Sequence, residues 1–220
     1  MTAPSMPEAE TAHLIDAYKQ AQVILEYGSG NSTKLASQMT GKLVLSVESD
    51  RHWARNLRRE IDKAHRTSPA IVYHVDIGPT GPWGRPVDES GWKRYHLYPN
   101  AIWDESFFRH PDVVLIDGRF RPACLIATML HATRPVTVLF DDYTDRPRYG
   151  LIERILPPAR LIGRMAEFHV RPGQLRPQDI GFAIGLFFDV VVHGRGAAAY
   201  QLPTGSLDPQ TAPAAERSKT

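Results

Sequence analysis

The 220-residue sequence predicts an α/β fold, in which a mostly parallel sheet carries helices on both faces. Two observations lead to this prediction. Short runs that are apolar throughout alternate with segments of helical periodicity, and continuous apolar runs are typical of parallel strands buried on both faces. The composition, 42% hydrophobic and 23% charged, is that of an ordinary globular chain with a packed core. We therefore expect a single α/β domain over residues 1–193.

The expected elements follow in order along the chain. A helix is predicted at 8–20, and parallel strands are predicted at 23–25, 43–47, 71–75, 113–116 and 136–140. The apolar run at 180–193 is interpreted as a further buried strand. Helices are predicted at 32–39, around 125–129 and after Asp145. Another should begin at Ser49 or Asp50, with an apolar face of Trp53, Leu57, Ile61 and Ala64.

Two segments depart from this alternation. Residues 78–111 form a longer connection than usual and hold three of the four tryptophans, so we interpret them as an aromatic-rich insertion. Trp83 and Trp103 are candidates to contact a bound molecule, because ligand pockets are commonly lined by aromatic side chains. The alternative is a hydrophobic cluster that only seals the edge of the sheet. Residues 194–220 are predicted to be a disordered tail.

Charge and cysteine content exclude several classes of protein. The 26 basic and 24 acidic residues give a formal charge of +2, which argues against a nucleic-acid partner. The single cysteine, Cys124, excludes an intrachain disulfide and a multi-cysteine zinc site. The longest apolar run is too short to cross a bilayer, and the N-terminus lacks the features of a secretory signal. We expect a cytoplasmic protein with no membrane partner.

An acidic residue follows each predicted parallel strand. In an open α/β sheet, ligands bind beyond the carboxyl ends of the strands, so these acids are candidate site residues. Each one taken alone could instead cap the following helix. Together they indicate a binding site at one edge of the sheet. The five are Glu26, Glu48, Asp76, Asp117 and Asp141.

The turn after the first strand combines two glycines with an acid. Gly28 and Gly30 allow a ligand to approach bare backbone at a helix N-terminus. Glu26 would repel a pyrophosphate and favours a ligand with a cationic group, and Thr33 stands where a nicotinamide fingerprint has a third glycine or alanine. Glu48 follows Gly28 by 20 residues, the spacing at which a carboxylate binds ribose hydroxyls.

Four motifs, VILEYGSGNST, VLSVESD, VDIG and DVVLIDGRF, resemble those of the class I S-adenosylmethionine-dependent methyltransferases. The resemblance covers residues 21–192. It implies a Rossmann-like, doubly wound sheet with a last strand pair at 161–170 and 180–192, the latter antiparallel. It also implies S-adenosylmethionine as cofactor, with Glu48 on the ribose and Asp76 and Ile77 on the adenine. The implied contact residues are Glu26, Gly28, Ser29, Gly30, Ser32, Thr33, Glu48, Ser49, Asp76, Ile77 and Asp117.

A finer resemblance links the chain to catechol-type O-methyltransferases, which hold magnesium after their fourth and fifth strands. It implies that Asp117, Asp141 and Asp142 bind Mg²⁺ and that Asp117 and Asp142 act in catalysis. The chain departs from that family in having Asp142 where the family has Asn. The alternative is that Asp141 and Asp142 only cap the following loop. Further candidates to contact the substrate are Tyr143, Arg146 and Tyr149.

The sequence thus predicts an S-adenosylmethionine-dependent methyltransferase that acts on an oxygen of a small-molecule or glycan-like acceptor. Two alternatives stay open: a cofactor-binding protein of the same fold that has lost catalysis, and a nicotinamide-dependent oxidoreductase. The sequence does not identify the acceptor or the oligomeric state.

Overall fold

The computed structural model of the chain describes residues 4–64 and 66–190, so the predicted tail at 194–220 lies outside the described residues. The strands are β1 (Val23–Tyr27), β2 (Leu43–Glu48), β3 (Ala70–His74), β4 (Val113–Ile116), β5 (Val136–Phe140), β6 (Arg160–Ile162) and β7 (Met165–Val170). The α-helices are α1 (Glu8–Gln20), α2 (Asn31–Gln38), α3 (Arg51–Lys63), α4 (Leu97–Asn100), α5 (Arg121–His131) and α6 (Ile180–Leu186). Short 3-10 helices are η1 (Pro82–Gly84), η2 (Trp92–Arg94), η3 (Ala101–Asp104), η4 (Pro147–Arg154) and η5 (Pro177–Asp179).

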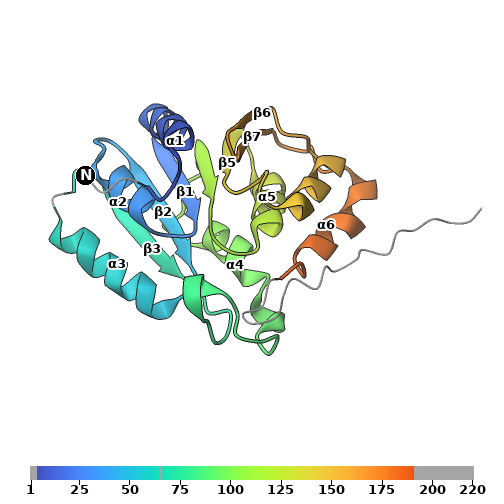
Figure 1. Ribbon diagram of the computed structural model, residues 1–220, viewed down its shortest axis with the longest axis horizontal. Coiled ribbons are helices and arrows are strands. Elements are labelled where there is room, and N and C mark those ends of the chain that lie inside the picture. The colour runs from blue at the N-terminus through green and yellow to red at the C-terminus, as the bar shows by residue number, and fades with distance from the viewer. Residues whose placement is uncertain (1–3, 65, 191–220) are drawn as a thin grey trace, which may run out of the picture.

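All seven strands belong to one sheet with the order β3-β2-β1-β4-β5-β7-β6 (Figure 1). Strands β1 to β5 are parallel, whereas β7 runs antiparallel to β5 and β6 runs antiparallel to β7. The predicted Rossmann-like fold with an antiparallel end is therefore confirmed. The sheet of dinucleotide-binding folds, with strand order 3-2-1-4-5-6, is a different arrangement, because it has no antiparallel strand next to β5.

The prediction of a strand at 180–192 is wrong for the residues that the structure describes. The antiparallel strand is β7, and residues 180–186 form α6. Ala183 and Leu186 are buried at a helical spacing of three, while Ile180 and Ile184 stay exposed. A short run that is apolar throughout fits either a strand or a helix, so periodicity could not separate the two. Among the described helices, none is long and apolar enough to span a membrane.

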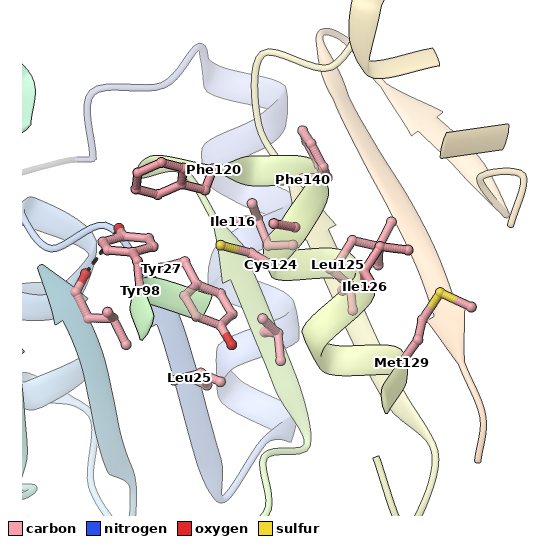
Figure 2. Packing of buried hydrophobic residues seen from close by; sticks show 14 of the residues in the cluster. Leu25, Tyr27, Tyr98, Ile116, Phe120, Cys124, Leu125, Ile126, Met129 and Phe140 are labelled. Atoms are coloured by element: carbon pink, nitrogen blue, oxygen red, sulfur yellow. Dashed lines mark hydrogen bonds between the residues drawn. The ribbon is translucent and has the colours of Figure 1, made fainter. Parts of the chain in front are cut away.

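Helices cover both faces of the sheet because side chains of a strand alternate between the faces. On one face Ile24 of β1 packs with Leu14 and Tyr18 of α1, and α2 and α3 continue this layer. On the other face Leu25 and Tyr27 of β1 lie in a cluster with α4, α5 and α6. Figure 2 shows the side chains of this second cluster meeting between the sheet and α5.

Helix α3 begins where the sequence predicted. The Asp50 carboxylate accepts hydrogen bonds from the N–H groups of His52 (2.8 Å) and Trp53 (2.9 Å), which caps the helix. Its buried face includes Leu57 and Ile61 as predicted, but Trp53 is 51% exposed. The structure turns Trp53 toward the end of β1, where its Nε1 donates to the carbonyl of Ser29 at 2.8 Å.

The insertion at 78–111 divides into two parts. Its later part packs into the core, with Tyr98 and Trp103 buried and the Trp103 Nε1 donating to the hydroxyl of Tyr27 at 2.7 Å. Its earlier part reaches the end of β2, where the hydroxyl of Ser49 donates to the carbonyl of Gly84 at 2.9 Å. The insertion therefore both extends the core and contributes one wall at the carboxyl edge of the sheet.

Candidate functional site

A cavity of about 530 Å³ opens at the carboxyl ends of β1, β2, β4 and β5. Strand β1 lies between β2 on one side and β4 on the other, so the direction of the strand order reverses at this point of the sheet. Open α/β sheets bind ligands at such points, and the volume lies in the range of about 300 to 1,000 Å³ typical of small-molecule sites. The walls come from the turns after these four strands, residues 4–6, the insertion and Arg164.

The glycine turn forms one wall. Gly28 has φ +98°, and a Cβ there would lie 2.7 Å from the Cα of Gly118, so only glycine lets β1 and β4 approach this closely. Gly30 lines the cavity with no atom within 4 Å of where its Cβ would stand. The turn thus exposes backbone directly to the cavity, together with Ser29 and Ser32.

Glu48 closes the next part of the wall. One carboxylate oxygen accepts from the N–H and hydroxyl of Ser29 (3.3 and 2.8 Å), and the other accepts from the N–H groups of Ser49 and Asp50 (2.8 and 2.9 Å). These donors hold the carboxylate in place beside the glycine turn. Glu48 and Ser49 both line the cavity, as predicted for residues that bind the cofactor.

Glu26 and Thr33 stand behind the glycine turn, outside the cavity lining. Glu26 is fully buried and accepts hydrogen bonds from the hydroxyls of Tyr18 (2.6 Å) and Thr33 (2.5 Å). Burial raises the pKa of Glu26, against the lowering effect of these hydroxyls. Thr33 also accepts from the N–H of Gly30 at 3.0 Å. Glu26 of β1 and Thr33 of α2, with Tyr18 of α1, therefore support the glycine turn from behind.

Asp76 and Ile77 also lie away from the cavity. The Asp76 carboxylate is exposed, pairs with Arg94 and accepts from the N–H of Gly78 at 2.9 Å. Ile77 is fully buried, with its carbonyl directly against Gly91 of the insertion. The insertion therefore covers the end of β3, and the structure does not bring these two residues to the site with Glu48.

Three carboxylates form the opposite wall. Oxygen atoms of Asp117, Asp141 and Asp142 all lie within 4.8 Å of one another. Adjacent side chains of a strand point to opposite faces, but β5 ends at Phe140 and Asp142 has φ +54°, so the chain has left the strand. This turn lets both Asp141 and Asp142 line the cavity beside Asp117.

Guanidinium groups hold these carboxylates. Arg121, at the first turn of α5, lies 3.0 Å from both Asp117 and Asp142, and its side chain is only 5% exposed. Arg164, in the turn between β6 and β7, lies 2.9 Å from Asp141 and 3.3 Å from Asp142. The sequence predicted the three acids but neither of these partners.

The position of Arg164 depends on the N-terminal helix. Its backbone N–H donates to the buried carboxylate of Glu10 in α1 at 2.8 Å, and its carbonyl accepts from the N–H of Tyr143 at 2.7 Å. Helix α1 and the loop after β5 thus hold the β6–β7 turn against the triad.

The environment of Asp117 changes its acidity. Desolvation and the neighbouring carboxylates of Asp141 and Asp142 raise the pKa of Asp117 to about 6, while Arg121 acts in the opposite direction. A carboxyl with such a pKa changes its charge near neutral pH. This is the property expected of a proton acceptor in a binding site.

The residues predicted to contact the substrate fall into two groups: some line the cavity, and others are buried. Trp83 and Arg146 line the cavity, and Arg146 lies 3.4 Å from Asp142. Trp103 and Tyr143 are core residues, since Trp103 stacks on His131 and the hydroxyl of Tyr143 donates to Glu153 at 2.9 Å. Tyr149 is buried and borders a small adjoining cavity of about 20 Å³.

Backbone strain gathers around the cavity. Among the described residues, three that are not glycine have positive φ: Trp83 (63°), Phe120 (51°) and Asp142 (54°). Trp83 and Asp142 line the main cavity and Phe120 lines the small one. Such conformations cost about 1 to 3 kcal/mol each and are found preferentially at functional sites.

The structure also adds wall residues that the sequence did not indicate. Some of these residues could have been found from the sequence. Arg119 and Arg121 lie just after the Asp-Gly pair of the fourth motif, and Trp53 lies in the first turn of the helix after Glu48. The turn between β6 and β7 carries no comparable signal. The added residues include Trp53, Arg85, Tyr98, Arg119, Arg121 and Arg164.

Comparison with known proteins gives a relative of high similarity. A methyltransferase-like protein from Silicibacter pomeroyi has a crystal structure that matches with 46% sequence identity and a TM-score of 0.79, over 84% of this chain and 96% of that one. An O-methyltransferase from Bacillus cereus, solved in complex with SAH, matches with 15% identity and a TM-score of 0.45, over 77% of this chain and 82% of that one. The second likeness is too distant to bear on the site. No protein-family model matches the sequence, and no curated protein matches it.

Proposed function

This chain belongs to the same family as the methyltransferase-like protein of Silicibacter pomeroyi, and from that premise we propose that it is an S-adenosylmethionine-dependent methyltransferase. Its acceptor would offer an oxygen atom and would be a small molecule or a glycan. The observation that carries the proposal is the convergence of the glycine turn, Glu48 and Asp117 on one cavity at the switch point of the sheet.

The chain's own residues fit such a cofactor. The open backbone at Gly30 gives room for the methionine part, and Glu48 offers a fixed carboxylate for the ribose hydroxyls. Trp53 and Trp83 offer partly exposed aromatic surface on the same wall. When bound, the cofactor supplies an electrophilic methyl group on a positively charged sulfur.

The chain would contribute positioning and a proton acceptor. Methyl transfer is an in-line displacement, so its rate depends mainly on holding the acceptor oxygen in line with the methyl group. The Asp117 carboxylate would take the proton from the acceptor hydroxyl, since its pKa of about 6 leaves it mostly ionised at pH 7. Arg121 would hold this carboxylate in position through its contacts with Asp117 and Asp142.

Magnesium fits this site less well than the carboxylates alone suggest. Their oxygens are close enough to share a cation. However, Arg121 and Arg164 already place positive charge on all three acids, so a metal ion would have to displace guanidinium groups. With Arg146, which also pairs with Asp142, the three acids face three arginines, and no step of the proposed transfer depends on a metal. The resemblance to catechol-type enzymes predicts magnesium dependence, whereas these ion pairs favour transfer without a metal, and chelation separates the two.

The test is a titration of the protein with S-adenosylhomocysteine (SAH), the demethylated cofactor, with NAD as comparison ligand. We expect binding of SAH and none of NAD. An acceptor screen with and without EDTA then follows, and we expect turnover that survives chelation. Absence of SAH binding would contradict the proposal. Binding without turnover on any acceptor would instead identify a cofactor-binding protein of the same fold.

A pH profile tests the role of Asp117. The rate constant kcat/KM should rise as pH increases through about 6, because the base must lose its proton to act. Asp117→Asn should lose this rise and lower kcat/KM by about 100- to 10,000-fold. A profile that keeps its rise in Asp117→Asn would assign the proton transfer to another group.

The cytoplasmic location and the extent of the domain over residues 1–193 stay predictions.

A further inference from the structure

The cavity contains buried donors that the protein does not satisfy. Within residues 4–64 and 66–190, the buried side-chain nitrogen and oxygen atoms without a hydrogen-bond partner are the Nε atoms of three arginines, Arg85, Arg119 and Arg146. All three arginines line the same cavity. A buried unpaired donor costs about 1 to 3 kcal/mol, so such atoms call for an explanation in a bound group. Their location favours a ligand with acceptor atoms.

Five carboxylates and five guanidinium groups line the cavity, but they do not all pair with one another. Glu48 is held by backbone donors and Asp50 caps α3. The acidic triad is held by Arg121, Arg146 and Arg164.

Arg85 and Arg119 remain: within the described part of the chain, the ion pairs of the cavity are made by Arg121, Arg146 and Arg164. The cavity therefore carries two positive charges without an acidic partner. An anionic ligand would give both guanidinium groups an acidic partner.

The two arginines line the same cavity and their charges interact. Burial, and the positive charges of Arg121 and Arg85, lower the pKa of Arg119. The two like charges repel each other, and an anion bound by both would relieve this repulsion. The planar guanidinium fork suits two-oxygen groups such as carboxylate and phosphate, which it can bind through two parallel hydrogen bonds.

The position of Arg119 favours the acceptor over the cofactor as the source of this anion. Arg119 and Gly118 lie on the side of β4, where they also border the small cavity of about 20 Å³ next to Phe120 and Tyr149. The acid that lines this small cavity, Asp189, is already paired with Arg148. The glycine turn and Glu48 lie on the side of β1 and β2. The cofactor's own carboxylate is the competing occupant, and the experiment below separates the two.

We propose that the methyl acceptor carries an anionic group, a carboxylate or a phosphate, which Arg85 and Arg119 hold so that its hydroxyl lies beside Asp117. This inference rests on the proposed methyltransferase function, because it names the class of acceptor for that reaction. Arg146, whose Nε is also unpartnered, lies on the same wall next to Asp142 and completes the positive rim.

The experiment measures two affinities in the full-length chain. SAH is titrated into the free protein, and inorganic phosphate is titrated into the SAH-loaded protein, for the wild type and for Arg85→Met and Arg119→Met. Arg55→Met serves as the matched control, because Arg55 is an exposed arginine on α3 outside the cavity. Arg119→Lys keeps the charge and removes the planar fork.

We expect phosphate affinity to fall about 10- to 100-fold in Arg85→Met and Arg119→Met, less in Arg119→Lys, and not at all in Arg55→Met. SAH affinity should stay within about twofold in every variant. Matched acceptors extend the test: 3,4-dihydroxybenzoate against catechol, and glucose 6-phosphate against glucose. The anionic member of the productive pair should have the lower KM, and this advantage should vanish in Arg119→Met.

Each other outcome has a definite meaning. Equal losses of SAH and phosphate affinity in Arg119→Met would assign the arginines to the cofactor's carboxylate and overturn the inference. Phosphate affinity that is unchanged in both methionine variants would also overturn it. Arginine-dependent phosphate binding in a protein that does not bind SAH would refute the proposed function and keep the anion site. Thermal unfolding of each variant shows whether a loss of binding reflects a loss of folding.

Discussion

In the half of the cavity formed after β1 and β2, the Glu48 carboxylate accepts hydrogen bonds from three backbone N–H groups and from the hydroxyls of Ser29 and Ser49. In the half formed after β4 and β5, three carboxylates are held by guanidinium groups. The first half is built from two turns joined by local hydrogen bonds. The second is built from side chains that come from distant parts of the chain.

This difference has consequences for how each half responds to change. Most donors to Glu48 are backbone N–H groups, which are present whichever side chains their residues carry. The first half therefore depends on the backbone conformation of the two turns. The second half depends on charge balance, because removing one partner of a buried ion pair leaves the other charge uncompensated. We therefore expect backbone substitutions to damage the first half, and pH or arginine substitutions to damage the second.

Among substitutions that line the cavity, the largest effect on stability should come from Arg121→Met. Arg121 is almost fully buried and bridges Asp117 and Asp142, so its loss should lower the free energy of unfolding by about 3 to 5 kcal/mol at pH 8. Urea denaturation at pH 8 and pH 5 measures it.

The sign of the pH dependence follows from Asp117. Its pKa in the folded protein is raised to about 6, so its contribution to stability is fully present below its unfolded pKa and is lost as pH rises through 6. Without Arg121 that pKa rises further, so the variant should lose less stability at pH 5 than at pH 8. The control is Arg134→Met, which breaks the more exposed pair with Asp112 and should cost at most about 1 kcal/mol.

The same variant sharpens the question of magnesium. If Mg²⁺ stabilises Arg121→Met at pH 8 and leaves the wild type unchanged, the guanidinium group stands where a cation would otherwise bind. Equal stabilisation of both proteins by Mg²⁺ would contradict this interpretation and support a metal site in the native chain.

Gly28→Ala should have the next largest effect. A Cβ at this position meets the backbone of Gly118 at 2.7 Å and the positive φ disfavours any residue but glycine, so we expect a loss of about 2 to 4 kcal/mol in unfolding free energy. Gly30→Ala is the matched control, because its Cβ would meet no atom within 4 Å. Its stability should change by less than about 1 kcal/mol, while SAH affinity falls. Equal stabilities of the two variants would show that β1 and β4 tolerate separation at this turn.

Glu48→Ala should weaken SAH binding by about 1 to 3 kcal/mol, because a carboxylate that accepts from ribose hydroxyls would be lost. Calorimetric titration measures this. Glu60→Ala, which removes an exposed acid of α3 paired with Lys34, should leave SAH affinity unchanged. Unchanged SAH affinity in Glu48→Ala would show that the ribose does not bind beside Glu48.

The smallest effect on stability is expected for Trp83→Ala. Its side chain is 83% exposed, so unfolding should change by less than about 0.5 kcal/mol, while the KM of cofactor or acceptor rises. Trp103→Ala provides the contrast, because it opens the core and should lower unfolding free energy by about 3 to 5 kcal/mol. If both variants lose stability alike, the whole insertion is a structural cluster.

Most of the sheet and the first half of the cavity could be predicted because their signals are local. Apolar runs identify the parallel strands, and the spacing from Gly28 to Glu48 reports two turns that lie side by side when β1 and β2 pair. Local signals failed where two structures share one pattern. The apolar run at 180–186 fits a strand as well as a helix. The tryptophans of the insertion likewise do not reveal from the sequence whether they line a cavity or pack into the core.

The sequence by itself determined which residue types stand at the carboxyl edge of the sheet, because the residues at this edge are those that directly follow each parallel strand in the chain. Only the tertiary structure decided what those residues meet. Arg164 reaches Asp141 across 23 positions of sequence, and its turn is held by Glu10 from the opposite end of the chain. Ion pairs of this kind depend on distance in space, and no periodicity or spacing along the chain encodes that distance. For the same reason, only the tertiary structure places Arg85 and Arg119 in the cavity outside its ion pairs.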